Sequence, residues 1–290
     1  IDGDSTTEAT VFEYQFNIGL STSFTGEDSL DVAIDSGNVA AATDDNPMGF
    51  DTGSALSVDG ITYSFPLGGL SMIVGVDTDI KASFTGACKY SAFTDYMGKC
   101  GVDKSVDVGG NGATVTGSYE FDSGFSLAAG ISGTADGADT TASKVGLLTK
   151  EGQDTYAINA AYIADTWGVS TAYASDDNAT GAETTYWGAE AYYSFDFADV
   201  SVGFETEETS GTDKSGYFVG VTIPEVGVGS VSIGAATAGN FADTETEYMI
   251  YEASYSYPVN DGMTITPGVF IEEKSGDDLT GVLVTTSFSF

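Results

Sequence analysis

Apolar and polar residues alternate along most of this chain, and residues 12–21 show the pattern clearly. Every second position from 12 to 20 holds Phe, Tyr, Phe, Ile or Leu, while Glu, Gln, Asn, Gly and Ser occupy the positions between them. Because side chains of a β-strand point alternately to its two faces, this segment is predicted to be a strand with one apolar and one polar face. The last residues, 281–290, repeat the pattern and end on Phe290.

Fifteen segments with this alternation can be placed along the chain, and most have about ten residues, the length of a tilted strand that crosses a bilayer. Their approximate positions are 11–24, 30–35, 55–66, 70–82, 113–122, 124–134, 154–163, 167–175, 185–196, 199–207, 215–223, 229–238, 247–257, 263–273 and 280–290. The 38 glycines, 17 phenylalanines and 16 tyrosines also favour strands and tight turns over helices.

The connections between these segments alternate between short and long. Short ones lie at 66–69, 122–124, 165–166, 197–199 and 260–262, and long acidic ones at 38–54, 84–112, 135–153, 176–184, 207–214, 239–246 and 273–280. In bacterial membrane barrels, short turns face the periplasm and long loops face outward. The alternation therefore predicts an all-β chain that forms one transmembrane antiparallel β-barrel domain over residues 1–290, rather than a soluble sandwich.

The strand count carries an expectation of its own. Bacterial single-chain barrels have an even number of strands. If the strand at 280–290 runs toward the periplasm, the strand at 11–24 also does, because fifteen strands alternate in direction. We therefore expect one further strand before Ile1 and sixteen in all, with fourteen as the alternative if one segment was wrongly divided.

Composition excludes several classes of function. The chain carries 44 acidic residues against eight lysines, with no arginine or histidine, and a formal charge of −36. Nucleic acid is excluded as a partner because few groups here can neutralise phosphates. Missing histidines remove Ser-His-Asp and Cys-His catalysis and the commonest zinc ligand. We expect no enzyme activity, no metal site and no cofactor, and at most weak calcium or magnesium binding by the acidic loops 38–54 and 135–153.

Hydropathy and the two cysteines each add a constraint. No apolar run approaches the roughly 20 residues of a membrane-spanning helix, which excludes a helical membrane protein but leaves a barrel open. Cys88 and Cys100 lie twelve positions apart. A disulfide between them would fit an oxidising compartment, and a pair of free thiols is the alternative.

Residues 11–38 resemble a known family, and the phrase Thr22-Ser-Phe-Thr-Gly-Glu-Asp28 is the most specific part. They are similar to the opening barrel hairpin of cyanobacterial outer-membrane porins that carry a surface-layer-homology domain, which are related to carbohydrate-selective porins. In that family the second strand of the hairpin is basic, with arginines before a Gly-Asn pair. Here the strand carries Asp31 and Asp35 before Gly37-Asn38, so the family's selectivity cannot be transferred.

The resemblance implies a location and partners. It implies the outer membrane of a Gram-negative-type bacterium, a cyanobacterium, with outer-membrane lipid around a homotrimer. It also implies an upstream domain that binds a cell-wall polymer, a coiled-coil spacer and a first barrel strand, none of which lies in these 290 residues. The upstream strand agrees with the strand count above.

If the apolar faces meet lipid, the opposite faces line the lumen, and ten acidic residues are predicted there. They are Glu13, Asp31, Asp35, Asp77, Asp79, Glu120, Glu190, Glu205, Glu252 and Glu272. Acids in a water-filled channel raise the local cation concentration and repel anions. The alternative is that they only keep the lumen hydrated.

The loop at 84–112 is the candidate constriction, since with one upstream strand it is the third external loop, which in general porins folds into the lumen. A Cys88–Cys100 bridge would stiffen its tip. Four lysines in or beside it are candidates for a cationic patch opposite the acidic wall, and three aspartates accompany them: Lys81, Lys89, Lys99, Lys104, Asp95, Asp103 and Asp107. Pairing of these lysines with neighbouring surface acids is the alternative.

These observations give a leading function and two alternatives. The leading one is a passive outer-membrane porin through which small hydrophilic solutes and inorganic ions diffuse, narrowed by the loop at 84–112. A selective channel for sugars or a nutrient ion is the second. An acidic secreted surface or adhesin β-protein without a pore is the third.

Overall fold

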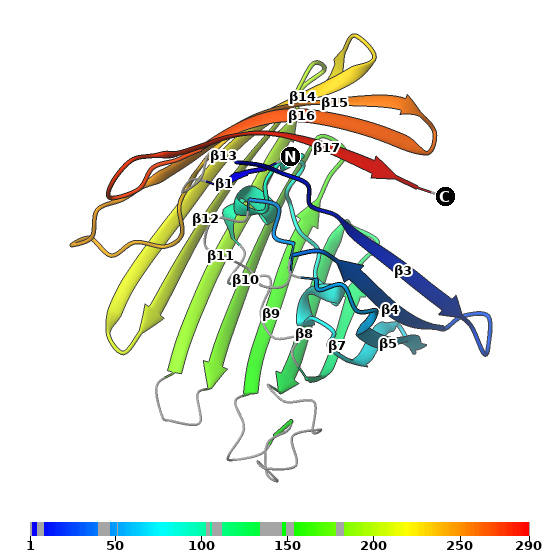
Figure 1. Cartoon of the computed structure of the whole chain (residues 1–290). Coiled ribbons are helices and arrows are strands. Elements are labelled where there is room, and N and C mark those ends of the chain that lie inside the picture. Colours follow the sequence, from blue (N-terminus) through cyan, green and yellow to red (C-terminus); the bar gives the residue numbers. More distant parts are fainter. Residues whose placement is uncertain are drawn as a thin grey trace.

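The structure, a computed structural model, describes residues 2–4, 9–39, 47–50, 52–102, 105, 112–133, 147–148, 154–177 and 183–289. Its main element is one antiparallel sheet of 15 strands, in which every strand pairs with its neighbours in sequence from β3 to β17 (Figure 1). The strands are β3 (Gln15–Thr22), β4 (Ser29–Gly37), β5 (Ser57–Leu67), β6 (Leu70–Val76), β7 (Ala113–Glu120), β8 (Phe125–Gly133), β9 (Asp154–Ile163), β10 (Trp167–Asp177), β11 (Glu183–Ser194), β12 (Asp199–Thr209), β13 (Thr212–Val226), β14 (Gly229–Thr237), β15 (Met249–Asn260), β16 (Met263–Glu272) and β17 (Leu279–Phe288).

Cross-strand register keeps the two faces of the sheet distinct. Asn17 pairs with Asp35 on the inner face, while Ile18 pairs with Ile34 on the outer face. The outer face is apolar and uncovered, as shown by the exposed side chains of Phe204 and Trp187. Since the sheet curls around its polar face, it has the inside-out polarity of a membrane barrel (Figure 1).

All fifteen segments predicted from the alternation are strands, so the alternative count of fourteen is wrong. Several strand boundaries differ from the prediction, and two of these differences change a connection. The connection expected at 207–214 is a two-residue turn, because Ser210 and Gly211 both adopt the positive φ that such hairpin turns require. The segment expected at 70–82 ends at Val76, where Asp77 turns with φ of 50°.

A small sheet and two 3₁₀ segments lie outside the main sheet. A separate two-stranded sheet pairs β1 (Asp2–Asp4) with β2 (Ala9–Val11), which the sequence did not predict. Two 3₁₀ segments, η1 (Ile80–Ser83) and η2 (Asp95–Gly101), lie between β6 and β7. In the described part of the chain, no helix has both the length and the apolar character needed to cross a membrane.

The strands β3 and β17 are the two edges of the sheet, shown in blue and red in Figure 1. They run in the same direction, because the strands alternate in direction from β3 to β17. No pairing joins these two edges within the described residues. A cavity of about 810 Å³ is lined by both, including Gln15 and Asn17 from β3 and Thr285 and Ser287 from β17.

The turn between β3 and β4 is organised around Asp28, the last residue of the sequence phrase Thr22–Asp28. Its Oδ1 accepts hydrogen bonds from the hydroxyl of Ser23 at 2.6 Å and the N–H of Thr25 at 2.8 Å, and its Oδ2 from the hydroxyl of Tyr63 at 2.6 Å. These donors, Ser23 first and then Tyr63 and Thr25, hold the pKa of Asp28 well below its usual range. The carboxylate therefore fixes the turn and joins it to β5.

We expect Asp28→Asn to lower the thermal unfolding temperature at pH 7, because the amide replaces an acceptor oxygen with a donor that faces other donors. A depressed carboxyl pKa contributes stability above its unfolded value of about 3.9 and loses it as the pH falls further. The difference between wild type and variant should therefore shrink below about pH 4. Circular dichroism melts in detergent measure it, with Asp122→Asn in another turn as the control. Equal melting temperatures for Asp28→Asn and wild type at pH 7 would contradict this role.

Candidate functional site

The connection between β6 and β7 spans residues 77–112, and its described part lies against the inner face of the sheet (Figure 1). It begins seven residues earlier than the predicted 84–112 because β6 ends at Val76. Ile80 of η1 is buried against Ala157 of β9 and Ala174 of β10. We call the described part, residues 77–102 and 105, the inner loop.

Two buried glutamates bind the main chain of the inner loop. Glu190 of β11 accepts the N–H of Ala87 at 2.7 Å and the hydroxyl of Ser170 at 2.8 Å. Glu205 of β12 accepts the N–H of Ser105 at 2.6 Å. Their exposed fractions are 5% and 2%, so these carboxylates see little water and depend on protein donors.

A third glutamate, Glu252 of β15, is 3% exposed and holds the middle of the inner loop. It accepts the consecutive N–H groups of Phe93 and Thr94, each at 2.8 Å, and the hydroxyls of Thr94 at 2.6 Å and Tyr90 at 2.8 Å. Burial, then the charge of Glu252 and its hydrogen bond, raise the pKa of Tyr90. Tyr90 therefore stays neutral and donates.

Each of the three glutamates has glycine as a cross-strand neighbour. The pairs are Glu190 with Gly203, Glu205 with Gly188 and Gly216, and Glu252 with Gly234. A methyl group on Gly203 would come within 1.9 Å of the carbonyl oxygen of Cys100, and one on Gly188 within 1.9 Å of Oγ of Ser105. The glycines therefore let the loop backbone lie directly on the wall beside the carboxylates.

Apolar side chains on the inner face pack against the same loop. Tyr90, Met97 and Cys100 form a buried cluster with Phe218 and Ile250. These wall residues were missed from the sequence, since the inner face was expected to be polar throughout. A signal existed at 217–219, where Tyr, Phe and Val make both faces of β13 apolar at one level.

A second cluster lies closer to β17 and has the same character. Phe93 of the inner loop packs against Phe270 of β16 and against Leu279 and Leu283 of β17. The run Val282-Leu-Val284 is again apolar on both faces. The inner loop is thus fixed from β9 across to β17.

Cys88 and Cys100 are joined in a disulfide across the tip of the inner loop. Lys99, Cys100 and Gly101 follow one another with φ of 50°, 51° and 67°, a left-handed turn that L-residues rarely adopt. Cys100 is fully buried and Cys88 is half-buried.

Lys81 and Lys89, two lysines of the expected cationic patch, lie beside different parts of the wall. Lys81 forms an ion pair with Asp79 at 2.8 Å and borders a cavity of about 260 Å³ with Asp31, Asp59 and Asp77. It therefore lies within the acidic wall formed by β4 and its neighbours.

Lys89 lies elsewhere, over the end of β11. Its Nζ is 2.9 Å from Oγ of Ser194 and 4.6 Å from the ring centre of Tyr192. Lys99 belongs to the left-handed turn, and Asp95 is exposed with its N–H bonded to the carbonyl of Pro47. The other three candidates, Asp103, Lys104 and Asp107, lie outside the described residues.

The other predicted lumen acids occupy separate places. Asp35 is buried on the inner face of β4, Glu120 is exposed at the end of β7, and Glu272 of β16 lies 3.5 Å from Nζ of Lys274. Glu13 borders the cavity between the sheet edges. Within the described residues, no three His, Cys, Asp or Glu side chains are grouped to hold a metal ion.

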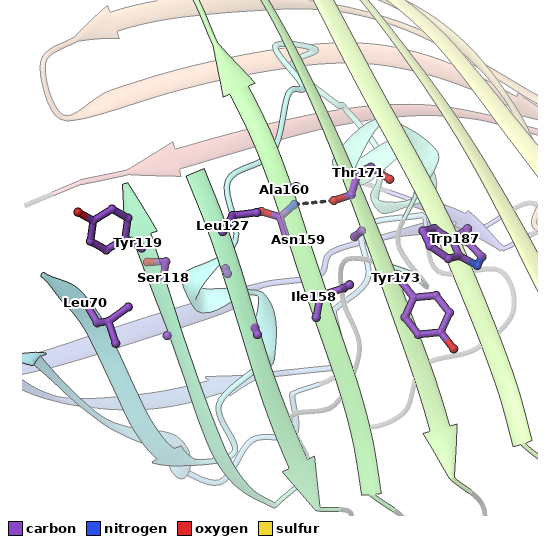
Figure 2. A pocket seen from close by; sticks show the side chains of 14 residues that line it. Leu70, Ser118, Tyr119, Leu127, Ile158, Asn159, Ala160, Thr171, Tyr173 and Trp187 are labelled. Carbon is purple, nitrogen blue, oxygen red and sulfur yellow. Dashed lines mark hydrogen bonds between the residues drawn. The ribbon is translucent and has the colours of Figure 1, made fainter. Parts of the chain in front are cut away.

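A depression of about 430 Å³ lies on the outer face between β6 and β11 (Figure 2). It is lined by small residues such as Gly117, Ala129 and Ala160 and by larger side chains such as Tyr119 and Trp187. Apolar pockets often mark ligand sites, but this one is part of an outer face that is apolar and exposed throughout. The chemistry-bearing residues gather on the opposite face, under the inner loop.

We expect Glu252→Gln to loosen the inner loop, because the amide offers donors to the N–H groups of Phe93 and Thr94, and an unpaired buried donor costs about 1–3 kcal/mol. Trypsin cleavage after Lys89 or Lys99, followed on reducing gels, should be faster than in wild type. Glu120→Gln is the matched control, since it removes the same charge from an exposed inner position. Equal cleavage rates in both variants would show that Glu252 does not hold the loop.

Gly203→Ala should disturb the same contact from the wall side, since its Cβ would press on the backbone oxygen of Cys100. We expect a destabilisation of about 1–3 kcal/mol, as for other overpacked sites. Gly19→Ala is the matched control, because an added Cβ there meets nothing within 4 Å. Thermal unfolding in detergent measures both variants, and a Gly203→Ala protein as stable as Gly19→Ala would refute the close contact.

Comparisons with known proteins agree on the fold. No protein-family model and no curated protein matches the sequence. A porin structure refined at 1.8 Å resolution is 16% identical, and the match covers 95% of this chain and 92% of that chain with a TM-score of 0.63. Two mutants of the porin of Rhodopseudomonas blastica are each 14% identical, with 96% and 90% of the two chains covered and TM-scores of 0.56. At these identities the likeness concerns architecture, and the chain has the fold of a porin.

Proposed function

We propose that this protein is a passive outer-membrane pore for small hydrophilic solutes and inorganic ions. The observation that carries the proposal is the inner loop, which crosses the inside of a porin-fold sheet and is held there by Glu190, Glu205 and Glu252. A loop fixed at this position narrows the passage, and no separate domain is needed to do so. The inward acids lie on separate strands, which supports transport rather than acid–base catalysis.

The charge of the interior supports a preference for cations. Asp31, Asp59, Asp77 and Asp79 border one cavity with the single ammonium of Lys81. Carboxylates beside a water-filled passage attract cations and repel anions. The acids buried under the inner loop contribute less to this cation preference, because they are covered and hydrogen-bonded.

The opposite side of the interior supports a general rather than a sugar-specific pore. Its wall from β14 to β17 offers uncharged hydroxyl groups, including those of Ser232, Ser254, Thr266 and Thr285. Hydroxyls suit water and neutral solutes alike. We therefore treat diffusion of small sugars as part of the same passive function.

We also infer that a further strand closes the barrel between β3 and β17. An open sheet edge in hydrocarbon leaves backbone groups unpaired, which does not occur in membrane barrels. Because both edges run in the same direction, one strand antiparallel to both can pair with the open backbone groups of each. Its source is a segment of the same polypeptide before Ile1, as the resemblance of residues 11–38 to cyanobacterial porins implies.

The finer biological setting rests on that same resemblance. We propose the outer membrane of a cyanobacterium, a homotrimer, and an upstream domain that attaches the barrel to a cell-wall polymer. The exposed apolar outer face supports lipid as the surrounding medium.

The proposed function is tested in planar bilayers. We expect stepwise conductance and a reversal potential in a KCl gradient with the sign of cation preference. A charge about 10 Å from an ion in water changes its energy by ~0.4 kcal/mol, about twofold in concentration. Each carboxylate acts in opposite senses on cations and anions, so the Asp31→Asn, Asp59→Asn double variant should lower the cation-to-anion permeability ratio by at least about fourfold, and Asp122→Asn in a turn should leave it unchanged. Membranes that stay non-conducting would favour a surface β-protein without a pore.

A further inference from the structure

The connection between β4 and β5 brings residues 47–50 onto the inner loop. Pro47 is fully buried, and its carbonyl oxygen accepts the N–H of Asp95 at 2.8 Å. Met48 packs against the apolar cluster that holds Phe93. A second connection is therefore fixed inside the sheet, on top of the first.

Residues from these two connections make one side of the cavity of about 810 Å³ apolar. Met48 and Phe50 border it from the β4–β5 connection, and Ala92 and Phe93 border it from the inner loop. Phe93 is mostly covered by its cluster, whereas Met48 and Phe50 are half-buried. We call these four residues the apolar lip. Its most accessible aromatic ring is that of Phe50.

Hydroxyl groups of the wall adjoin the apolar lip. A methyl group on Gly268 of β16 would clash with the ring of Phe93, so this ring rests on the wall at Gly268. Ser254 of β15 is the cross-strand partner of Gly268, and Thr266 is the next inward residue along β16. Thr285 of β17 pairs with Thr266. These three hydroxyl-bearing residues border the same cavity as the lip.

Charge is sparse around this cavity. Of the described residues that border it, Glu13 alone is charged. Asp31 and Asp59 border the other cavity, of about 260 Å³. Uncharged solutes therefore meet a surface that is distinct from the one that attracts cations.

The closing strand inferred above is compatible with this surface. Neighbouring strands of a sheet lie side by side, about 4.8 Å apart. A strand between β3 and β17 would therefore continue the wall at the two edges. The lip, which lies on the inner loop, and the hydroxyls on the inner faces of β15 and β16 would still border the passage.

We propose that the apolar lip and the adjoining hydroxyls form a binding site for uncharged solutes that combine a planar apolar face with a hydrogen-bonding edge, such as small aromatic amides. This inference rests on the proposed pore function. The face of such a solute packs on Phe50 and Met48, since aromatic rings and thioethers both attract a planar ring. Its polar edge meets the hydroxyls of Ser254 and Thr266, which can donate and accept.

A solute without an apolar face gains much less from this site. Its hydrogen bonds to the wall only replace those that it makes with water, so their net contribution is small. The lip would leave such a solute with no apolar surface to cover. The site therefore distinguishes neutral solutes of equal size, which a passage lined by water and hydroxyls alone does not.

The test compares nicotinamide with erythritol, two uncharged solutes of the same molecular mass. Nicotinamide has a planar ring and an amide, and erythritol has only hydroxyls on a short chain. Each is titrated onto single channels in KCl in planar bilayers. A fall in conductance that saturates marks binding, whereas a fall proportional to concentration reflects the slower movement of ions in the mixture. We expect saturation with nicotinamide and not with erythritol.

Variants assign the binding to the two parts of the site. Phe50→Ser should weaken nicotinamide binding about two- to tenfold, the range of one aromatic contact. Thr266→Val removes a hydroxyl at nearly constant shape and should weaken it over a similar range. Phe197→Ser is the matched control, because Phe197 lies exposed in the turn between β11 and β12, and it should leave binding unchanged.

Conductance in KCl alone shows whether a variant has moved the loops. If Phe50→Ser changes that conductance, Thr266→Val decides. Equal responses to the two solutes in wild type, or nicotinamide binding that Thr266→Val and Phe50→Ser both leave unchanged, would overturn the proposal. A wild-type chain without any conductance would instead contradict the pore function itself, so the two failures are distinguishable.

Discussion

The arrangement of the interior depends on buried carboxylates that accept main-chain N–H groups. A carboxylate removed from water needs several strong hydrogen bonds, and the wall of a barrel offers few donors because its own backbone is paired between strands. The inner loop supplies the missing donors, including consecutive N–H groups at Phe93 and Thr94. The hydrogen-bonding needs of the two parts therefore match, since the loop supplies N–H donors and the wall supplies carboxylate acceptors.

This mutual requirement explains the composition around the loop. Glycines beside Glu190, Glu205 and Glu252 let the backbone come close enough for short hydrogen bonds. The inward apolar residues of β13 and β16 complete the contact by excluding water. The result is a passage whose shape follows from packing and hydrogen bonds, while charge is concentrated at β4 and its neighbours.

The fold was predictable because alternation over about ten residues is a strong signal for a strand with unlike faces. The prediction from alternation failed where strands continue into segments that are polar on both faces. Around Ser210 and Gly211 the chain is polar on both faces, with Glu207 and Glu208 as successive residues, so a hairpin had the composition of a loop. The same polar composition hid the separate sheet of β1 and β2.

The candidate site was predictable only in part. Alternation placed Glu190, Glu205 and Glu252 on the inner face, and the long connection before β7 was recognised as the candidate constriction. Their contact was not predictable, because pairing between a loop and a wall far apart in sequence leaves no periodic trace. Exposed acids such as Glu120 and covered ones such as Glu252 are indistinguishable until the path of the loop is known.

Amide hydrogen exchange of the folded protein in detergent, resolved by NMR, tests the central claim most directly. The account predicts slow exchange for the N–H groups of Ala87, Phe93, Thr94 and Ser105, with protection that falls at Phe93 and Thr94 in Glu252→Gln and persists in Glu120→Gln. Exchange at these four amides as fast as in an exposed turn would contradict it, since the loop would then not be bound to the wall carboxylates.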